Sequence, residues 1–176
     1  LESFVAGRHA LEKRTVLEVS VDRGGTTTTY RALNEASLEK LTAGHTVRLA
    51  VEIDDAPFTT YQADGLIVAT PTGSTAYSLS ARGPVISPLL RAVLVTPLSP
   101  HMLFDRSLVL SHDERVAITI TGSRSVGVAV DGEFLGELQP GDRITCRESA
   151  EPAIFVRLHN RRFHQVLKTK FGLADR

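Results

Sequence analysis

Two short stretches of this sequence carry side chains that could bind a small polar ligand. In the first, small hydroxyl residues and a glycine follow an apolar segment, in the run Thr70-Pro71-Thr72-Gly73-Ser74-Thr75-Ala76-Tyr77. Backbone N–H groups at the start of a helix, together with hydroxyl groups, can hold an anion or a polar ligand. The stretch has no lysine after its glycine, so it is not a P-loop, and it is not a GxSxG nucleophile elbow. A ligand-binding loop and an ordinary capped loop are equally open at this point.

The second stretch is the pair Asn34-Glu35. A carboxylate beside an amide can hold the two hydroxyl groups of a ribose through paired hydrogen bonds. The alternative is that Asn34 caps a short helix over residues 35–41 that Gly44 ends, and local signals alone favour this cap. No metal site is predicted, because the six histidines lack ligand spacing and Asp54-Asp55 is typical of a turn between strands.

Composition excludes several classes of protein. The 176 residues carry 20 basic and 20 acidic side chains, and this zero net charge argues against a nucleic-acid-binding protein. No apolar stretch approaches the roughly 20 residues of a membrane helix. A single cysteine, Cys146, forbids an internal disulfide and indicates a reducing compartment, so we expect a cytoplasmic protein. The length predicts a single domain over residues 1–176, and because the first residue is Leu1 we expect a longer translation product.

The elements that must position these residues are mostly strands. Residues 46–53 alternate apolar and polar side chains, as a strand with one buried face does, and Leu66 to Ala69 suits a strand buried on both faces. A short helix with a capping residue at each end is expected over residues 76–81, and a terminal helix from Phe163 to Phe171. The predicted fold is therefore mainly β, with two packed, mostly antiparallel sheets like those of a β-sandwich, one or two short helices and a C-terminal helix.

The stretch from Asp64 to Ala81, DGLIVATPTGSTAYSLSA, resembles the signature of the NAD kinase family. Further stretches agree with the family in order: Ala32-Leu33-Asn34-Glu35, Pro97-Leu98-Ser99-Pro100-His101 with Arg106-Ser107-Leu108-Val109, Asp131-Gly132, and the terminal helix. The resemblance covers nearly all of the chain from Arg14 onward. It implies a phosphotransferase with an alcohol group as acceptor, which transfers phosphate from ATP to the adenosine 2′-hydroxyl of NAD to give NADP.

The family's catalytic aspartate lies in a Gly-Gly-Asp-Gly motif on an N-terminal domain, and this sequence has no such motif. The chain thus resembles only the family's C-terminal domain, which binds NAD and builds the oligomer interfaces. The resemblance implies that no catalytic residue lies in this chain, that Mg²⁺ acts with ATP in the complete enzyme, and that the chain alone is inactive.

The resemblance also implies the roles of individual residues. Asn34 and Glu35 would hold the adenosine ribose, and Ser80 would reach toward the nicotinamide. Asp64 would contact the nicotinamide side, commonly from a neighbouring subunit of a homodimer or homotetramer. The adenine and ribose pocket would be lined by Thr72, Thr75, Ala76 and Tyr77.

Two other functions stay open. The first is the C-terminal domain of a lipid kinase of the diacylglycerol or sphingosine type, but such a domain needs an apolar channel, whereas Thr72, Ser74, Thr75 and Ser80 make a polar pocket. The second is a non-catalytic β-sandwich that binds a small ligand or only assembles.

Overall fold

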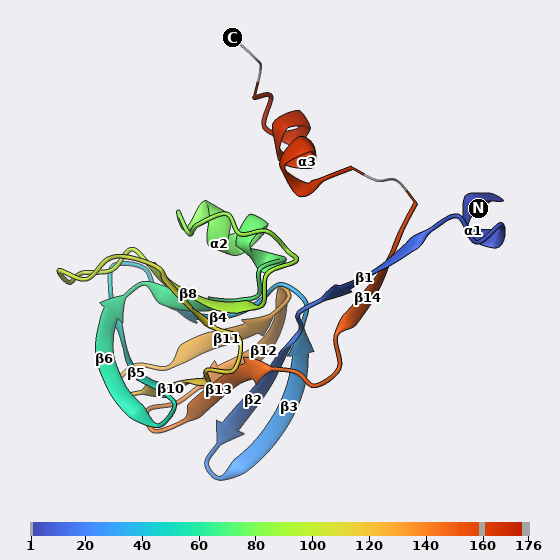
Figure 1. Cartoon of the computed structure of the whole chain (residues 1–176). Helices are drawn as coiled ribbons and strands as arrows, with labels where there is room; N and C mark the ends of the chain where they lie inside the picture. The colour runs from blue at the N-terminus through green and yellow to red at the C-terminus, as the bar shows by residue number, and fades with distance from the viewer. Residues whose placement is uncertain (1, 159–160, 174–176) are drawn as a thin grey trace.

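Two six-stranded sheets face each other in the computed structural model, which describes residues 2–158 and 161–173, with side chains from residue 4 onward (Figure 1). The first sheet has the order β3-β2-β13-β10-β5-β6, and the second has the order β12-β11-β4-β7-β8-β9. Every neighbouring pair within the two sheets is antiparallel. The expected pair of packed antiparallel sheets is confirmed.

The strands of the first sheet are β2 (Leu17–Arg23), β3 (Thr26–Ala32), β5 (Val47–Ile53), β6 (Ala56–Ala63), β10 (Val116–Ile120) and β13 (Arg143–Glu148). Those of the second are β4 (Glu35–Lys40), β7 (Gly65–Ala69), β8 (Ala92–Leu98), β9 (Leu108–Ser111), β11 (Val126–Val130) and β12 (Glu133–Leu138).

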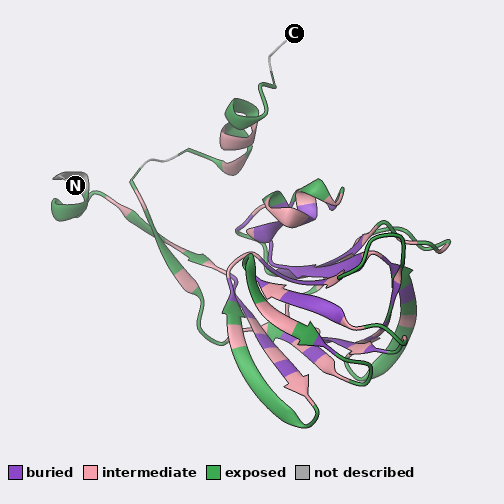
Figure 2. Ribbon diagram, turned by 180° about the vertical axis from the view of Figure 1, so that it is seen from behind, coloured by how far each residue is buried: buried purple, intermediate pink, exposed green. Residues whose placement is uncertain are grey.

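Alternation along the strands fills the space between the sheets with apolar side chains. Buried residues accordingly lie along the strands of both sheets (Figure 2). In β5, Val47, Leu49 and Val51 are buried in this core, as the alternating pattern predicts. The Cys146 side chain, on β13, is also fully buried there. One continuous core therefore joins eleven strands of the two sheets, from β2 to β13.

The strand β7 is buried on both faces, as its short apolar run predicts. Leu66 and Val68 belong to the core between the sheets. Ile67 and Ala69 point the other way and, with Ile86 and Leu94, form a smaller second core. This second core lies beneath a 3-10 turn, η1 (Gly73–Thr75), and a one-turn helix, α2 (Tyr77–Ser80), so the outer face of the second sheet is covered here (Figure 1).

Tight turns close the hairpins where the sequence predicts them. Asp54 and Asp55 both have positive φ, 49° and 64°, as the central residues of a turn between β5 and β6. Asp131 and Gly132 do the same between β11 and β12, with φ of 47° and 82°. The interpretation of Asp54-Asp55 as a turn is confirmed.

A two-stranded ribbon extends away from the sheets, formed by β1 (Ala10–Arg14) and β14 (Ala153–Arg157) (Figure 1). The chain begins with α1 (Glu2–Val5), at the far end of this ribbon. The expected terminal helix is present as α3 (Phe163–Lys170) and stops before Gly172, whose φ is 60°. None of the residues of α3 is buried, so this helix is not packed into the core (Figure 2). The pairing of β1 with β14 was not among the sequence predictions.

Two local predictions are wrong. The segment 35–41 is not a helix capped by Asn34: it forms β4, because Ala36 and Leu38 alternate into the core and the strand pairs on both sides with β7 and β11. The helix expected over 76–81 is shorter, and neither η1 nor α2 has a side-chain N-cap. The hydroxyl groups of Ser74 and Thr75, just before α2, bond to backbone carbonyls of the preceding turn instead.

Candidate functional site

Asn34 and Glu35 lie where the chain enters β4 from the first sheet. Because side chains alternate along a strand, Glu35, Ser37 and Glu39 point to the outer face of the second sheet while their neighbours Ala36 and Leu38 point into the core. Glu35 is paired with Ala69, whose side chain is in the second core. The strand therefore presents a row of polar side chains beside η1 and α2.

Asp131 holds the segment around Asn34 from one side. Its carboxylate accepts three backbone N–H bonds, from Leu33 (2.7 Å), Asn34 (2.7 Å) and Glu35 (3.0 Å). The Asp131 N–H donates in return to the Glu35 carbonyl at 2.9 Å. Hydrogen bonds to a charged acceptor are about twice as strong as neutral ones, so this turn fixes the backbone of the pair.

Thr70 and Gly73 hold the same segment from the other side. The Thr70 hydroxyl donates to the Leu33 carbonyl at 2.6 Å and accepts from the Gly73 N–H at 3.1 Å, while the Thr70 N–H donates to the Asn34 carbonyl at 2.8 Å. Gly73 is packed so closely that a Cβ there would lie 2.1 Å from the Asn34 carbonyl oxygen. The loop expected to bind a ligand and the pair Asn34-Glu35 are therefore parts of one site.

The Glu35 carboxylate is the most unusual group of this site. Its side chain belongs to a residue only 8% exposed, and its Oε2 atom is buried without a hydrogen-bond partner in the described part of the chain. Burial raises the pKa of Glu35, the nearby charge of Asp131 raises it further, and the Tyr77 backbone N–H opposes both effects. An unmet buried acceptor costs free energy unless something donates to it, and a ligand hydroxyl would do so.

Tyr77 is tied to the other end of the polar row. Its hydroxyl donates to Glu39 Oε2 at 3.0 Å, and the Ser37 hydroxyl donates to Glu39 Oε1 at 3.1 Å. Burial, the bond to Glu39 and the charges of Glu39 and Glu35 raise the pKa of Tyr77 to about 12. The phenol is therefore neutral at physiological pH and acts as a donor to the sheet.

The prediction that the loop exposes free donors is wrong. The N–H groups of Gly73, Ser74, Thr75 and Ala76 all bond within the turn or to Thr70. The Ser74 hydroxyl is fully buried, donates to the Pro71 carbonyl at 2.7 Å and accepts from the Ile86 N–H at 3.0 Å. Ser74 therefore builds the loop and does not line a pocket, because the tight 3-10 turn satisfies its own donors.

The remaining predicted residues divide between two cavities. Thr72 and Thr75 line one of about 980 Å³, which the ribbon and α3 complete. Tyr77 and Ser80 line another of about 560 Å³ on the other side of α2. Ala76 is half-buried between them, at the junction of η1 and α2. The helical segment thus separates two hollows, with Asn34 and Glu35 beneath it.

Within this chain, Asp64 does not join Glu35. It precedes β7 and forms an ion pair with Lys40, whose Nζ lies 2.6 Å from Asp64 Oδ1. Lys40 is the last residue of β4. It therefore lies five residue steps along the strand from Glu35, which is about 17 Å at the usual rise.

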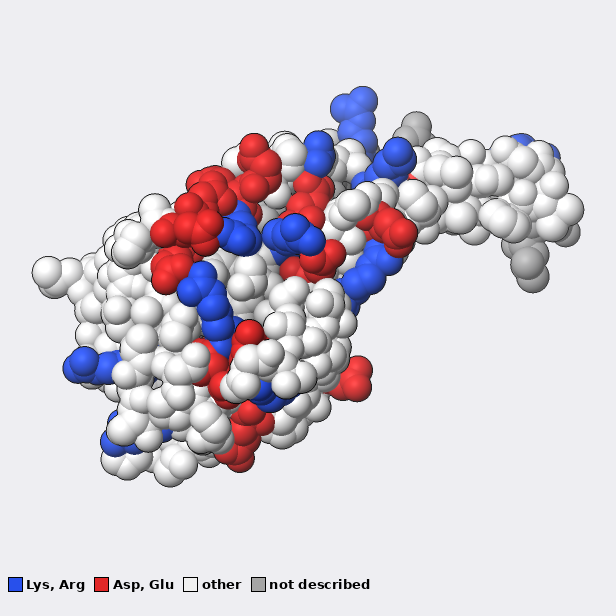
Figure 3. Space-filling view, turned by 90° about the horizontal axis from the view of Figure 1, so that it is seen from below, with Lys and Arg blue, Asp and Glu red and all other residues white. Residues whose placement is uncertain are grey.

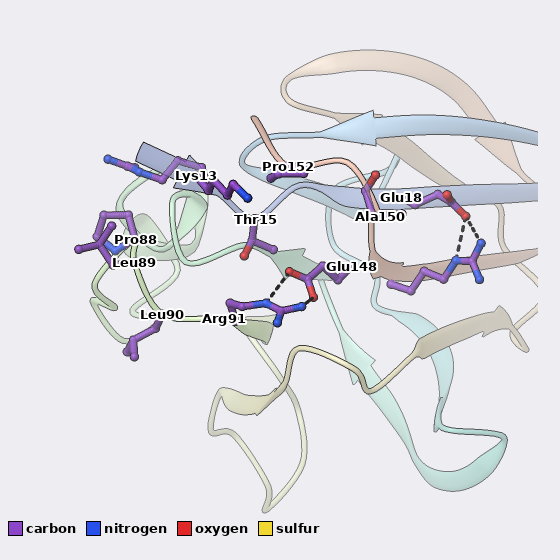
Figure 4. Close-up of a pocket in the computed structure, with 13 residues that line it drawn as sticks. Lys13, Thr15, Glu18, Pro88, Leu89, Leu90, Arg91, Glu148, Ala150 and Pro152 are labelled. Carbon is purple, nitrogen blue, oxygen red and sulfur yellow. Dashed lines mark hydrogen bonds and ion pairs between the residues drawn. The ribbon is translucent and has the colours of Figure 1, made fainter. Parts of the chain in front are cut away.

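A further cavity, of about 640 Å³, contains none of the predicted site residues (Figure 4). Its charges pair with one another: Arg91 makes two bonds to Glu148, and Arg147 binds Glu18. His112 Nδ1 also approaches Glu148 at 2.8 Å. The Arg147–Glu18 pair lies between the neighbouring strands β13 and β2 of the first sheet. The Arg91–Glu148 pair joins the end of β13 to the residue before β8 of the second sheet, so both pairs have a structural role.

The surface carries no single block of charge on the face seen from below, where acidic and basic side chains lie next to one another (Figure 3). Among residues 2–158 and 161–173, no three His, Cys, Asp or Glu side chains are arranged to hold a metal ion. In the same part of the chain, no helix is long and apolar enough to cross a membrane.

Several residues of the site were not predicted from the sequence as site residues. Asp131 was cited only with Gly132, as a pair that agrees with the family in order, and Thr70, Gly73, Ser37 and Glu39 were given no role of their own. Beside that agreement, the sequence signal for Asp131 was an Asp-Gly pair, which is typical of a tight turn. These contacts join residues about 100 positions apart, such as Asn34 and Asp131, so the sequence could not predict them without the fold.

Comparisons with known proteins bear on what this site does. Residues 33–158 match the sequence model of the ATP-NAD kinase C-terminal domain. The chain is 40% identical over its whole length to an NAD kinase of Carboxydothermus hydrogenoformans, and 42% identical over 98% of its length to one of Symbiobacterium thermophilum. It spans 64% and 62% of these relatives' lengths.

Two solved structures have the same fold. A yeast NADH kinase complexed with NADH aligns with a TM-score of 0.93 and 31% identity, covering 99% of this chain and 52% of that protein. An NAD kinase from Archaeoglobus fulgidus in complex with ATP aligns with a TM-score of 0.76 and 25% identity, covering 96% of this chain and 64% of that protein.

Proposed function

This chain belongs to the ATP-NAD kinase family, as its C-terminal domain, and we propose that it supplies the NAD site of an enzyme that phosphorylates the adenosine 2′-hydroxyl of NAD. The observation that supports this is the buried Oε2 of Glu35, which lacks a partner and lies on a backbone fixed from both sides. A ribose diol offers the hydroxyl donors that this oxygen needs.

In the proposed complex, each predicted residue has a task. Glu35 and Asn34 bind the ribose and hold its 2′-hydroxyl in place for transfer. Tyr77, which the resemblance assigns to the adenine and ribose pocket, lines the same cavity as Ser80. We therefore place its ring, tied to Glu39 through the phenol, on the nicotinamide side with Ser80. Thr72, Thr75 and Ala76 border the adenine side. Asp64 completes the nicotinamide side of a neighbouring subunit, and in its own chain it is paired with Lys40.

The rest of the reaction needs groups outside this chain. We expect the general base to come from a Gly-Gly-Asp-Gly segment that the relatives' additional length would hold, and Mg²⁺ to arrive with ATP and offset the charge of its phosphates. We therefore expect this chain alone, as a single domain, to make no NADP. A homodimer or homotetramer and a cytoplasmic location also remain predictions.

The lipid-kinase alternative is less favoured by the site. The row formed by Glu35, Ser37 and Glu39 is polar. A buried carboxylate oxygen that has no partner among the described residues suits a ligand rich in hydroxyl groups better than an alkyl chain. A non-catalytic binding module would share the same site and differ only in lacking the partner domain.

Calorimetric titration of NAD into the wild-type chain and a Glu35→Gln variant tests the proposal. Glu35→Gln keeps the shape of the side chain but weakens charge-assisted bonds to the ribose, so we expect about 10- to 100-fold weaker binding. Asp55→Asn, in the β5–β6 turn, is the matched control and should bind NAD like wild type. Equal affinity of Glu35→Gln and wild type would contradict the ribose role.

A further inference from the structure

Glu39 is a carboxylate of the site that the proposed reaction does not use. It lies on the outer face of β4, two strand positions beyond Ser37, and both of its oxygens are occupied by hydroxyl donors, from Tyr77 at 3.0 Å and from Ser37 at 3.1 Å. The Glu39 carboxylate is half-buried, and these two bonds hold it and the Tyr77 ring in a fixed relative position.

The position of Glu39 along β4 determines which part of a bound dinucleotide would lie near the Tyr77 ring. Glu39 lies four residue steps along the strand from Glu35, which is about 13 Å at the usual rise. If the adenosine ribose is held at Glu35, as proposed above, the other half of the dinucleotide must extend away from it. The cavity of about 560 Å³ that Tyr77 shares with Ser80 lies in that direction.

The two redox forms of the acceptor differ at that other half. The oxidised nicotinamide ring carries a positive charge, and the reduced ring is neutral. A cation is attracted to the face of an aromatic ring and to nearby carboxylates. A site with a net negative side chain under an aromatic ring therefore distinguishes the two forms.

Most other charges around Tyr77 cancel. Lys40, next to Glu39 in β4, is paired with Asp64 at 2.6 Å. In the cavity wall, Arg106 pairs with Asp105 at 3.2 Å. Arg82 also lines this cavity and has no ion-pair partner among the described residues, but water screens its charge because the residue is exposed. The bond from the phenol to Glu39 shifts electron density into the ring, and the raised pKa of Tyr77 keeps its proton in that bond.

We propose that Glu39, acting through the Tyr77 hydroxyl, is a positioning residue that makes this site bind the oxidised, cationic dinucleotide NAD⁺ more tightly than NADH. Ser37 holds the second oxygen of Glu39 and keeps the carboxylate turned toward Tyr77. This inference rests on the proposed function, because it assumes that the dinucleotide occupies the site.

The test compares the dissociation constants of NAD⁺ and NADH for the wild-type chain, Glu39→Gln, Tyr77→Phe, the double variant and the control Asp55→Asn. Wild type and the control should prefer NAD⁺. Each single variant should lower that preference by about 2- to 5-fold, the range of a cation–π contact. The double variant should lower it no further, because both changes break the same bond. Thermal melts of each variant check that the fold is intact.

The outcomes separate this inference from the function on which it rests. Binding of both nucleotides with a preference unchanged in Glu39→Gln and Tyr77→Phe would overturn the inference and leave the NAD site standing. Equal affinity of wild type for NAD⁺ and NADH would do the same. Binding of neither nucleotide by wild type would overturn the proposed function and the inference together. Additive losses in the double variant would show that Glu39 does not act through Tyr77 and would also overturn it.

Discussion

The surroundings of Glu35 disfavour the charged form of its carboxyl group. Burial and the charge of Asp131 raise its pKa above the ordinary 4.5, so the folded protein prefers the protonated form more than the unfolded chain does. The stability contributed by this preference is present below about pH 4.5 and is lost as the pH rises through the higher pKa of the folded state. Wild-type protein therefore carries a destabilising charge at neutral pH.

Glu35→Gln should relieve this cost. We expect the variant to be more stable than wild type at pH 7. The difference should shrink as the pH falls through the raised pKa of folded Glu35 and should vanish below about pH 4.5, where Glu35 is protonated in both states. Denaturant unfolding of both proteins from pH 4 to pH 8 measures the difference. A variant that is less stable than wild type at pH 7 would show that the carboxylate charge is satisfied in the fold. A gain in stability together with a loss of NAD affinity would identify Glu35 as a functional residue.

Asp131 is expected to matter for both stability and binding. Asp131→Ala removes the acceptor of three backbone N–H bonds, and we expect the free energy of unfolding to fall by about 2 kcal/mol. NAD affinity should fall as well, because Asn34 and Glu35 lose their fixed backbone. Glu151→Ala, which breaks an exposed pair with Arg31, is the control and should change stability by less than about 1 kcal/mol. Similar losses in the two variants would contradict the role given to Asp131.

At the level of single residues, sequence reasoning reached the two side chains that we propose to face the ligand, but not the residues that support them. Asn34 and Glu35 form a recognisable pair of polar types, whereas Thr70 and Asp131 are ordinary turn residues until the fold brings them to the same backbone. Local signals also favoured a helix cap for Asn34. The cap interpretation failed because pairing with β7 and β11, which no local signal reports, decides the conformation of residues 35–40.

The turn η1, in the middle of the loop 70–77, contacts the backbone of the proposed ribose site. Gly73 has no room for a side chain, since a Cβ would lie 2.1 Å from the Asn34 carbonyl oxygen and 2.6 Å from its carbon. Backbone atoms cannot move aside as a side-chain tip can, so a substitution here must displace the turn or β4.

Gly73→Ala should therefore lower stability by about 1 to 3 kcal/mol and weaken NAD binding. Gly122→Ala is the matched control, because a Cβ there would meet Arg48 at an ordinary 3.5 Å, and it should be nearly neutral. Melting temperatures and NAD titrations of the two variants give the comparison. An unchanged melting temperature in Gly73→Ala would show that the turn and the strand are not rigidly coupled.

Elements with strong periodicity were predicted well, and those held by distant contacts were not. Residues 47–53 alternate clearly and form β5, and the apolar run of β7 is buried on both faces as predicted. The ribbon strand β1 carries no such pattern: Leu11 is 65% exposed, and the strand exists because it pairs with β14, more than 140 residues later. Such pairing is invisible to any local window of sequence.

For the whole molecule, Cys146 reports on the integrity of the sandwich. The thiol is fully buried in the core between the sheets, and burial raises its pKa to about 12. We expect it to resist alkylation at pH 8 in the native protein and to react as soon as the sheets separate. Alkylation measured across a denaturant series should have the same midpoint as the loss of far-ultraviolet circular dichroism. Reaction well before that midpoint would mean that the two sheets do not unfold as one domain.

The ribbon also determines how the molecule would respond to tension. The outer ends of β1 and β14 lie side by side, at the pair Ala10 and Arg157, while the pair Arg14 and Ala153 lies next to the sheets. A force pulling these outer ends apart acts across the strands, so it breaks the pairs one after another from the tip, as a zipper opens. Shearing would instead load every pair at once. The ribbon therefore opens at low force, and η1, β4 and the Asp131 turn carry no load while it opens.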